Sequence, residues 1–119
     1  MKRQDISENQ AKIIFLGIGS NLGLRKRNIE TAKFLLGEHK IDFISVSSYY
    51  ETPSWPDPTK PKFLNIILKL KCKYNPHELL TICKDIEIKL GRKKAQKNAP
   101  RICDLDIIDF NNLVSKLIF

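Results

Sequence analysis

The amino-acid sequence predicts an α+β sandwich in which one antiparallel sheet carries two helices on one of its faces. Three observations favour this fold class: four strand-like apolar segments, two helix-like segments between them, and the order β-α-β-β-α-β in which they occur. The chain has 119 residues, enough for one modest core. We expect a single domain over residues 12–119, preceded by a disordered polar extension over residues 1–11.

The first half of the chain is predicted to form a strand, a helix and a second strand. Residues 12–18 (KIIFLGI) are a continuous apolar run typical of a buried strand, and the turn-forming sequence GSN follows at 19–21. Residues 25–36 have apolar side chains at helical spacing with charges between them, and Gly37 is expected to end this helix. The segment 41–52 (IDFISVSSYYET) alternates and is rich in β-branched and aromatic residues, which predicts a strand of about ten residues.

The second half is predicted to form a strand, a helix and a last strand. Four prolines within residues 53–62 indicate an exposed loop, and residues 63–74 (FLNIILKLKCKY) follow as the third strand. The sequence NPHE, with its N-cap asparagine, predicts a helix over residues 76–90, which a glycine then ends. Residues 101–110 (RICDLDIIDF) are the fourth strand. This order is that of a ferredoxin-like sandwich, which leaves the second face of its sheet open for ligands.

The composition excludes several classes of protein. Hydrophobic residues make up 42% of the chain and charged residues 29%, as in soluble globular domains. The apolar runs are too short to span a bilayer and the polar beginning is not a secretory signal, so we expect no membrane partner and a cytoplasmic location. The three cysteines include no CxxC pair, which predicts reduced, buried thiols instead of disulfides or a zinc site.

The net charge of +8 favours an anionic partner, which could be nucleic acid, an acidic membrane surface or a polyphosphate. The densest basic cluster is residues 89–101 (KLGRKKAQKNAPR), in which six of thirteen positions are Lys or Arg and none is acidic. Taken alone, this segment is more typical of a solvated charged turn than of a phosphate-binding loop.

Two acidic residues stand within the fourth strand, next to the basic cluster. Asp104 and Asp106 are two positions apart, so their side chains point to the same side of the strand, about 6.5–7 Å apart along its axis. A carboxylate pair of this kind can hold Mg²⁺, which binds a few carboxylate oxygens together with water and substrate phosphates. The alternative is an ion pair with the neighbouring basic residues. The six cations next to the pair favour a polyphosphate bridged by metal ions.

Two further features suggest a flat ligand on the open face. Phe63 and Asn65 share one side of the third strand, and an aromatic ring with an amide suits a planar heterocycle. The sequence GIGSNLG over 17–23 does not have the spacing of a dinucleotide-binding fingerprint. Its glycines allow a ligand to approach the backbone closely, although a simple tight turn explains them equally well.

Together these segments resemble the 6-hydroxymethyl-7,8-dihydropterin pyrophosphokinase family of folate biosynthesis. The matching stretches follow one another in register from about residue 12 to about residue 112: FLGIGSNLG (15–23), SSYYETP (47–53), PKFLN (61–65), IEIKLGR (86–92) and NAPRICDLDII (98–108). The resemblance implies ATP-dependent transfer of a pyrophosphate group onto the hydroxymethyl group of the dihydropterin, which leaves AMP.

The resemblance also implies roles for individual residues. Asp104 and Asp106 would bind two Mg²⁺ ions, with ATP as co-substrate. The nucleotide and its phosphates would be contacted from the second helix and the basic loop, by Glu87, Arg92, Lys94, Lys97 and Arg101, of which Arg92 and Arg101 are also catalytic. The pterin would be bound by Gly19, Thr52, Pro53, Phe63 and Asn65. In this family Lys94 and Lys97 often correspond to arginines, and a lysine lacks the bidentate guanidinium fork.

The resemblance further implies that the chain lacks the family's C-terminal elements, because members continue with a P-H-P segment and an R-x-F-V-x-x-P-L segment. An inactive remnant that keeps part of the ligand binding is therefore one alternative. Another is a small RNA-binding module with the same order of elements, although the third strand lacks that module's paired aromatic residues. We expect small-molecule substrates, no nucleic-acid partner and a monomer.

Overall fold

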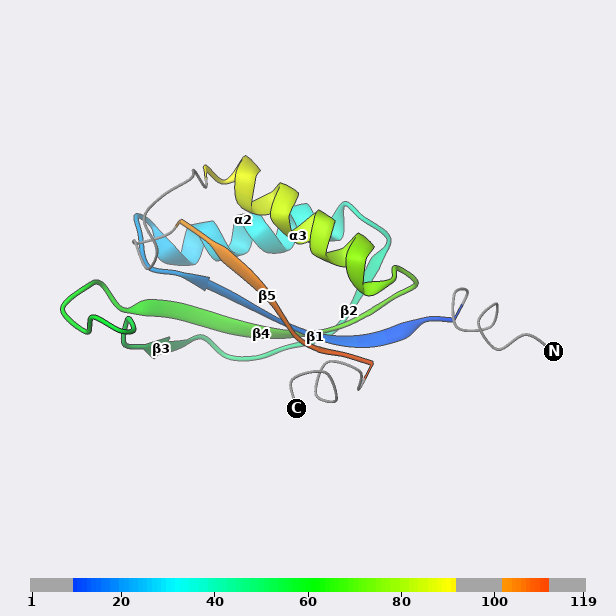
Figure 1. Cartoon of the computed structure of the whole chain (residues 1–119), viewed down its shortest axis with the longest axis horizontal. Helices are drawn as coiled ribbons and strands as arrows, with labels where there is room; N and C mark the ends of the chain where they lie inside the picture. Colours follow the sequence, from blue (N-terminus) through cyan, green and yellow to red (C-terminus); the bar gives the residue numbers. More distant parts are fainter. Residues whose placement is uncertain (1–9, 92–101, 112–119) are drawn as a thin grey trace.

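A single antiparallel sheet with both helices on one face organises the chain (Figure 1). The computed structural model describes residues 10–91 and 102–111. Its elements are, in chain order, β1 (Lys12–Ser20), α2 (Arg25–Gly37), β2 (Ile41–Val46), β3 (Tyr50–Thr52), β4 (Phe63–Cys72), α3 (Pro76–Lys89) and β5 (Asp104–Phe110). Residues 1–9 of the predicted extension over residues 1–11, and residues 92–101 of the basic loop, lie outside the described residues.

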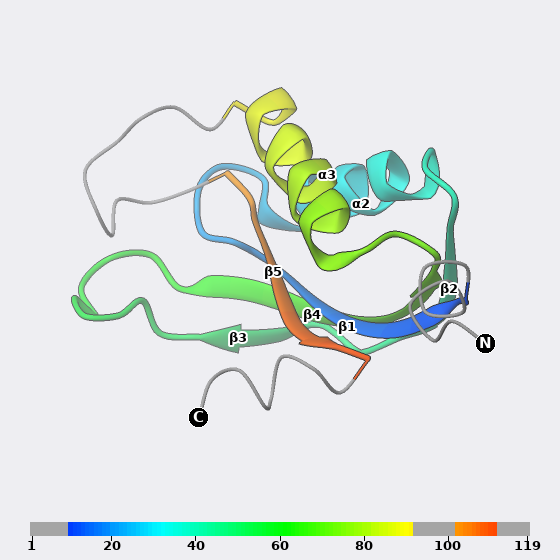
Figure 2. The same ribbon diagram turned by 45° about the vertical axis from the view of Figure 1, so that its right-hand side comes forward.

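The strand order confirms the predicted fold class. The sheet runs β2-β4-β1-β5, with β3 also paired to β4, and every pair is antiparallel. In this order the first and third strands of the predicted pattern are central, as in a ferredoxin-like sandwich. Figure 2 shows α2 and α3 side by side above the sheet, and its other face free of described helices.

The covered face is packed by the alternate apolar residues that the sequence indicated. Along β4, the side chains of Ile66, Leu68, Leu70 and Cys72 are buried, whereas Leu64 at the strand's beginning is half-buried. These residues form one core with apolar side chains from the other elements: Ile14, Leu16, Ile18, Ile29, Ala32, Leu36, Leu79, Ile86, Leu105 and Phe110. The helices therefore stabilise the sheet from one side, by apolar burial.

The predicted strand over residues 41–52 is in fact two strands, β2 and β3. They are separated at Ser47, whose side-chain oxygen accepts a hydrogen bond from the Ile67 backbone N–H at 2.8 Å. The Ser47 N–H donates to the Ile67 carbonyl at 2.9 Å. The serine hydroxyl thus substitutes for a backbone carbonyl of the ladder, a local competition that strand alternation does not reveal.

Other predicted boundaries shift by a few residues. The sequence predicted a turn at 19–21, but β1 continues through Ser20. The predicted third strand ends at Cys72 instead of residue 74. The start of α3 is confirmed: Asn75 and Glu78 form a reciprocal capping box, with the two hydrogen bonds at 2.8 and 2.9 Å.

All three cysteines are free and buried, as predicted. None of the described helices has the length and apolar character that crossing a membrane requires.

Candidate active site on the open face of the sheet

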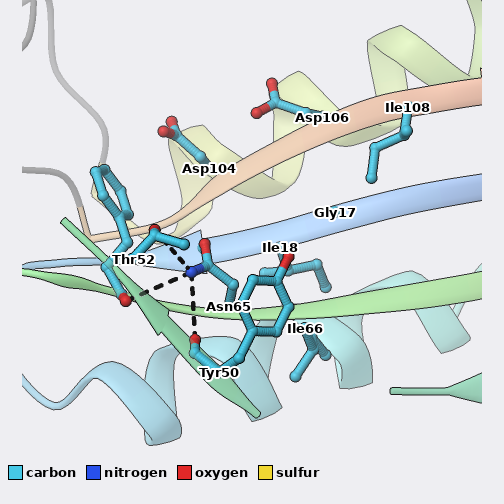
Figure 3. A pocket seen from close by; sticks show the side chains of 11 residues that line it. Gly17, Ile18, Tyr50, Thr52, Asn65, Ile66, Asp104, Asp106 and Ile108 are labelled. Carbon is cyan, nitrogen blue, oxygen red and sulfur yellow. Dashed lines mark hydrogen bonds between the residues drawn. The ribbon is translucent and has the colours of Figure 1, made fainter. Parts of the chain in front are cut away.

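A pocket of about 290 Å³ lies on the open face, where β1 ends and β5 begins (Figure 3). This volume is close to the lower end of the range for small-molecule sites, about 300–1,000 Å³. The strands β1, β3, β4 and β5 line it with Gly17, Ile18, Gly19, Tyr50, Thr52, Phe63, Asn65, Ile66, Asp104, Asp106 and Ile108. Residues predicted separately for metal binding and for heterocycle binding therefore share one pocket.

The pairing of β1 with β5 sets two glycines against two aspartates. Gly19 is the cross-strand partner of Asp104, and Gly17 is the partner of Asp106. Partners in an antiparallel pair lie about 4.5–5.5 Å apart, so side chains on β1 would occupy the space beside the carboxylates. The G-x-G spacing on β1 and the D-x-D spacing on β5 thus match, and together they keep the floor of the pocket open.

Gly19 also leaves room for the side chain of its second partner, Asn65 on β4. A Cβ at position 19 would lie 2.9 Å from Oδ1 of Asn65 and 3.4 Å from Cδ1 of Phe63. Because real Cβ atoms essentially never approach another heavy atom below 3.0 Å, any other residue would displace the amide. This close approach, not a tight turn, explains the glycine.

The amide of Asn65 is oriented by the strand next to it. Its Nδ2 donates to Oγ1 of Thr52 at 3.0 Å and to the backbone carbonyls of Tyr50 and Phe63 at 3.3 and 3.4 Å (Figure 3). The amide N–H groups are thereby directed to the protein, and the carbonyl oxygen to the side of Gly19. Thr52, which the resemblance implied as a pterin-binding residue, accepts the bond from Asn65 through its hydroxyl oxygen.

Two aromatic side chains complete the pocket wall. Phe63, predicted to stack on a planar ligand, lines the pocket and is half-buried. Tyr50 lines it from β3 and is 43% exposed, so its ring is accessible to a ligand. Aromatic faces of this kind suit a flat heterocycle.

Both aspartate carboxylates lie on the same side of β5, the side that lines the pocket (Figure 3). Asp106 is exposed and Asp104 is half-buried, while Leu105 between them is 4% exposed and packs in the core. The prediction that these two side chains share one side of the strand is confirmed. Both carboxylates can therefore reach a ligand while the strand between them stays anchored.

The donor set fits Mg²⁺ only if a substrate completes its coordination. Within residues 10–91 and 102–111, no three carboxylate, histidine or cysteine side chains gather to form a metal cage. Mg²⁺ does not require one, because it commonly binds one or two protein carboxylates together with waters and substrate phosphates. Two carboxylates beside an accessible pocket fit that requirement.

Glu87, predicted to contact a nucleotide, is 6% exposed within α3. Its Oε2 accepts a hydrogen bond from the Leu105 backbone N–H at 2.8 Å. The carboxylate therefore reaches the strand that carries the aspartates, and its contact with a nucleotide stays a prediction.

The segment that joins β3 to β4 beside the pocket is tied to the start of α2. Arg25 forms an ion pair with Glu51 at 2.8 Å and donates to the Lys62 carbonyl at 3.0 Å. The buried Asn21 donates to the Pro61 carbonyl at 3.2 Å. These contacts tie the segment 51–62, which leads from β3 to β4, to residues 21–25 at the start of α2.

Other predicted residues do not line the pocket or lie outside the described chain. Pro53 is exposed and is not among the lining residues. Arg92, Lys94, Lys97 and Arg101 lie outside the described residues, so their phosphate contacts stay predictions.

Sequence reasoning missed Tyr50, Gly17 and Ile108. Tyr50 and Ile108 each stand two positions from a predicted residue, Thr52 and Asp106, so strand alternation taken one step further would have found them. Gly17 was recognised as part of a glycine-rich stretch, but its role depends on the cross-strand register with Asp106, which the sequence does not state.

Comparison with known proteins identifies the family of the chain. The 7,8-dihydro-6-hydroxymethylpterin-pyrophosphokinase family matches residues 15–118. The chain is 38% identical to the 2-amino-4-hydroxy-6-hydroxymethyldihydropteridine pyrophosphokinase of Bacillus subtilis over 100 residues. The matched region covers 83% of this chain and 60% of that protein. With the enzyme of the same name from Aquifex aeolicus it is 37% identical, over 85% of this chain and 62% of the relative.

The likeness extends to longer proteins. The folic acid synthesis protein fol1 of Schizosaccharomyces pombe is 39% identical over 106 residues, 87% of this chain and 14% of that protein. The chain spans about 60% of the length of the bacterial relatives. These matches do not favour an RNA-binding module. With the family match covering most of the chain, and the aspartates and Asn65 meeting in one pocket, the chain belongs to the 7,8-dihydro-6-hydroxymethylpterin-pyrophosphokinase family.

Proposed function

We propose that this chain catalyses the transfer of a pyrophosphate group from ATP to the hydroxymethyl group of 6-hydroxymethyl-7,8-dihydropterin, releasing AMP. One observation carries the proposal: a row of cross-strand partners, Asp104, Gly19, Asn65 and Tyr50, runs across four strands. The row puts a carboxylate on one side of an open floor and an amide with an aromatic ring on the other. The residues proposed to bind metal and phosphate thus lie next to those proposed to bind the heterocycle.

In this function each side of the pocket has its own role. The pterin would lie over Gly19, stack on Phe63 and accept or donate hydrogen bonds at Asn65, whose orientation is set by Thr52. Asp104 and Asp106 would hold two Mg²⁺ ions, which when bound neutralise phosphate charge and activate the acceptor hydroxyl. Arg92, Lys94, Lys97 and Arg101 would stabilise the phosphate oxygens. Phosphoryl transfer depends mainly on such positioning and charge neutralisation, so no nucleophilic side chain is required.

The cellular setting belongs to the same proposal. Three free, buried thiols support a reducing compartment such as the cytoplasm. In the same proposal the chain acts on small-molecule substrates as a monomer and has no nucleic-acid partner.

The direct test is an assay of AMP formation by the purified chain with ATP, Mg²⁺ and 6-hydroxymethyl-7,8-dihydropterin. Calorimetry with a non-hydrolysable ATP analogue, with and without Mg²⁺, measures whether binding depends on the metal. We expect AMP release and metal-dependent binding in the wild-type chain. For variants of Asp104 or Asp106 in these assays, the matched control is Asp42→Asn on β2. It removes an exposed carboxylate from the sheet outside this pocket.

The outcomes separate the alternatives. A folded chain that binds the pterin but releases no AMP would be an inactive remnant, which contradicts the proposed activity. Binding of the ATP analogue that is unchanged without Mg²⁺ would contradict the metal role of Asp104 and Asp106.

A further inference from the structure

We propose that Glu87 is a positioning residue that holds the backbone between Asp104 and Asp106 in the arrangement that binds metal. This inference rests on the metal role of the two aspartates proposed above. It assigns Glu87 a role different from the nucleotide contact that the family resemblance implied.

The first observation is the bond itself. The Leu105 N–H donates to Oε2 of Glu87 at 2.8 Å, in a buried setting. Leu105 is the one residue between the two aspartates, and a peptide bond joins it to each of them. A fixed Leu105 N–H therefore limits the movement of both carboxylates at once.

The second observation is the place of this bond in the sheet. Of the described strands, β5 pairs only with β1, so it is an edge strand there. The outward N–H groups of an edge strand have no ladder partner and need another acceptor. Glu87 supplies that acceptor from α3, and it thereby joins the helix layer to the strand that bears the aspartates.

The third observation is the burial of a charged group. Glu87 is 6% exposed, and a buried carboxylate is unfavourable unless it is hydrogen-bonded. A serine or an amide could accept the Leu105 bond with a smaller desolvation cost. The bond from Leu105 offsets part of the cost of burying Glu87 and directs its side chain at β5, which suits a site whose ligands must be held within about 0.5 Å.

The charges of the three carboxylates act on the same surroundings. Burial, followed by the charges of Asp104 and Glu87, raises the pKa of Cys103 to about 12. Burial, followed by the charges of Glu87 and Asp106, raises the pKa of Cys83 to about 12. Glu87 is thus close enough to alter the electrostatics of the metal site as well as its geometry, and the test must separate the two effects.

Two conservative variants make that separation. Glu87→Gln keeps the side-chain length and a carbonyl acceptor for Leu105 but removes the charge. Glu87→Asp keeps the charge but is one methylene shorter, so it loses the reach to the Leu105 N–H. If Glu87 acts by positioning, Glu87→Asp should weaken metal binding more than Glu87→Gln. If it acts through its charge, Glu87→Gln should weaken metal binding more.

The measurement is Mn²⁺ affinity in the presence of a non-hydrolysable ATP analogue, followed by electron paramagnetic resonance of the full chain. We expect Glu87→Asp to weaken Mn²⁺ binding about 10–100-fold and Glu87→Gln to change it less than about threefold. The matched control is Glu78→Gln, a glutamate at the other end of α3 that contributes to the capping box. It is expected to leave Mn²⁺ affinity unchanged although it weakens the helix start.

A second readout does not depend on metal or on activity. Amide hydrogen exchange of Leu105, relative to that of Ile18 in β1, should accelerate at least about tenfold in Glu87→Asp and stay close to wild type in Glu87→Gln. If Glu87→Gln weakens Mn²⁺ binding as much as Glu87→Asp, or if neither variant changes it, the positioning role is wrong. If the wild-type chain binds no Mn²⁺, the proposed function fails, and the exchange of Leu105 still reports separately whether Glu87 holds the strand.

Discussion

The two faces of the sheet obey different requirements. On the face that α2 and α3 cover, Leu68 and Leu70 are fully buried and their neighbours are equally apolar. On the open face, Gly19 and Asn65 act through single atoms: a missing Cβ and the direction of an amide. The covered face depends on volume and burial, whereas the open face depends on particular groups at particular positions. Stability and ligand binding should therefore be separately mutable.

The aspartates on the open face give the largest expected effect. Replacing both Asp104 and Asp106 by Asn removes the negative oxygens that metal binding needs but keeps the side-chain shape. We expect AMP formation to fall by on the order of 10³-fold and the free energy of unfolding to change by less than about 0.5 kcal/mol. A large loss of stability in urea unfolding, or AMP formation near the wild-type rate, would contradict the claim that the open face serves ligand binding and the covered face stability.

A core substitution on the covered face should give the opposite pattern. Leu68→Ala leaves a cavity beneath the helices, so we expect the free energy of unfolding to fall by about 2–5 kcal/mol. The control is Lys71→Ala, an exposed residue of the same strand, with an expected change of less than about 0.5 kcal/mol. Substrate affinity, measured at a temperature where Leu68→Ala is folded, should match wild type.

Gly19→Ala sharpens the comparison with a single methyl group. The new Cβ would lie 2.9 Å from Oδ1 of Asn65, so the amide must move. We expect affinity for the pterin to fall about tenfold, which corresponds to about 1.4 kcal/mol. Gly37→Ala is the matched control, because nothing lies within 4 Å of its added Cβ; it should leave affinity unchanged. Equal behaviour of the two variants in calorimetry would show that the gap at Gly19 has no role.

The two faces of the sheet also differ in how much of their structure could be predicted from the sequence. The core side of β4 and the capping box of α3 were predictable, because burial alternates along a strand and Asn75 with Glu78 is a local signal. The role of Gly19 was not, because it depends on Asn65, which is 46 positions away in the sequence and is brought opposite by the strand register. The split of the second strand was hidden for a similar reason, since it involves Ser47 and Ile67.

The smallest expected effect is a change in how stability depends on pH, through a contact between Tyr49 and the helix α2. The Tyr49 hydroxyl donates to the Glu30 carboxylate on α2. Burial, followed by this bond and the charge of Glu30, raises the pKa of Tyr49 from 10.0 to about 12. Between these pH values the unfolded chain releases the tyrosine proton first, so the free energy of unfolding falls as pH rises.

The same contact acts in acid with the opposite sign. The bond from Tyr49 lowers the pKa of Glu30 below its usual 4.5, so its contribution is present above that pH and is lost as pH falls further. Urea unfolding of wild type and Tyr49→Phe at pH 8 and pH 11 checks the alkaline arm. We expect the variant to lose less stability over this interval, by under about 1 kcal/mol because the contact is partly exposed to solvent. An identical pH dependence would show that the bond does not contribute.

The three buried cysteines can report local opening of the fold through their reaction with an alkylating reagent. They are distributed over the fold: Cys72 ends β4, Cys83 lies in α3 and Cys103 directly precedes β5. Burial raises the pKa of all three thiols, that of Cys83 and Cys103 to about 12, so at pH 8 the folded chain offers almost no thiolate to an alkylating reagent. Each thiol reacts only when its own region opens. The order in which mass spectrometry detects alkylation then ranks the end of β4, the helix α3 and the start of β5 by their free energies of opening, without an introduced label.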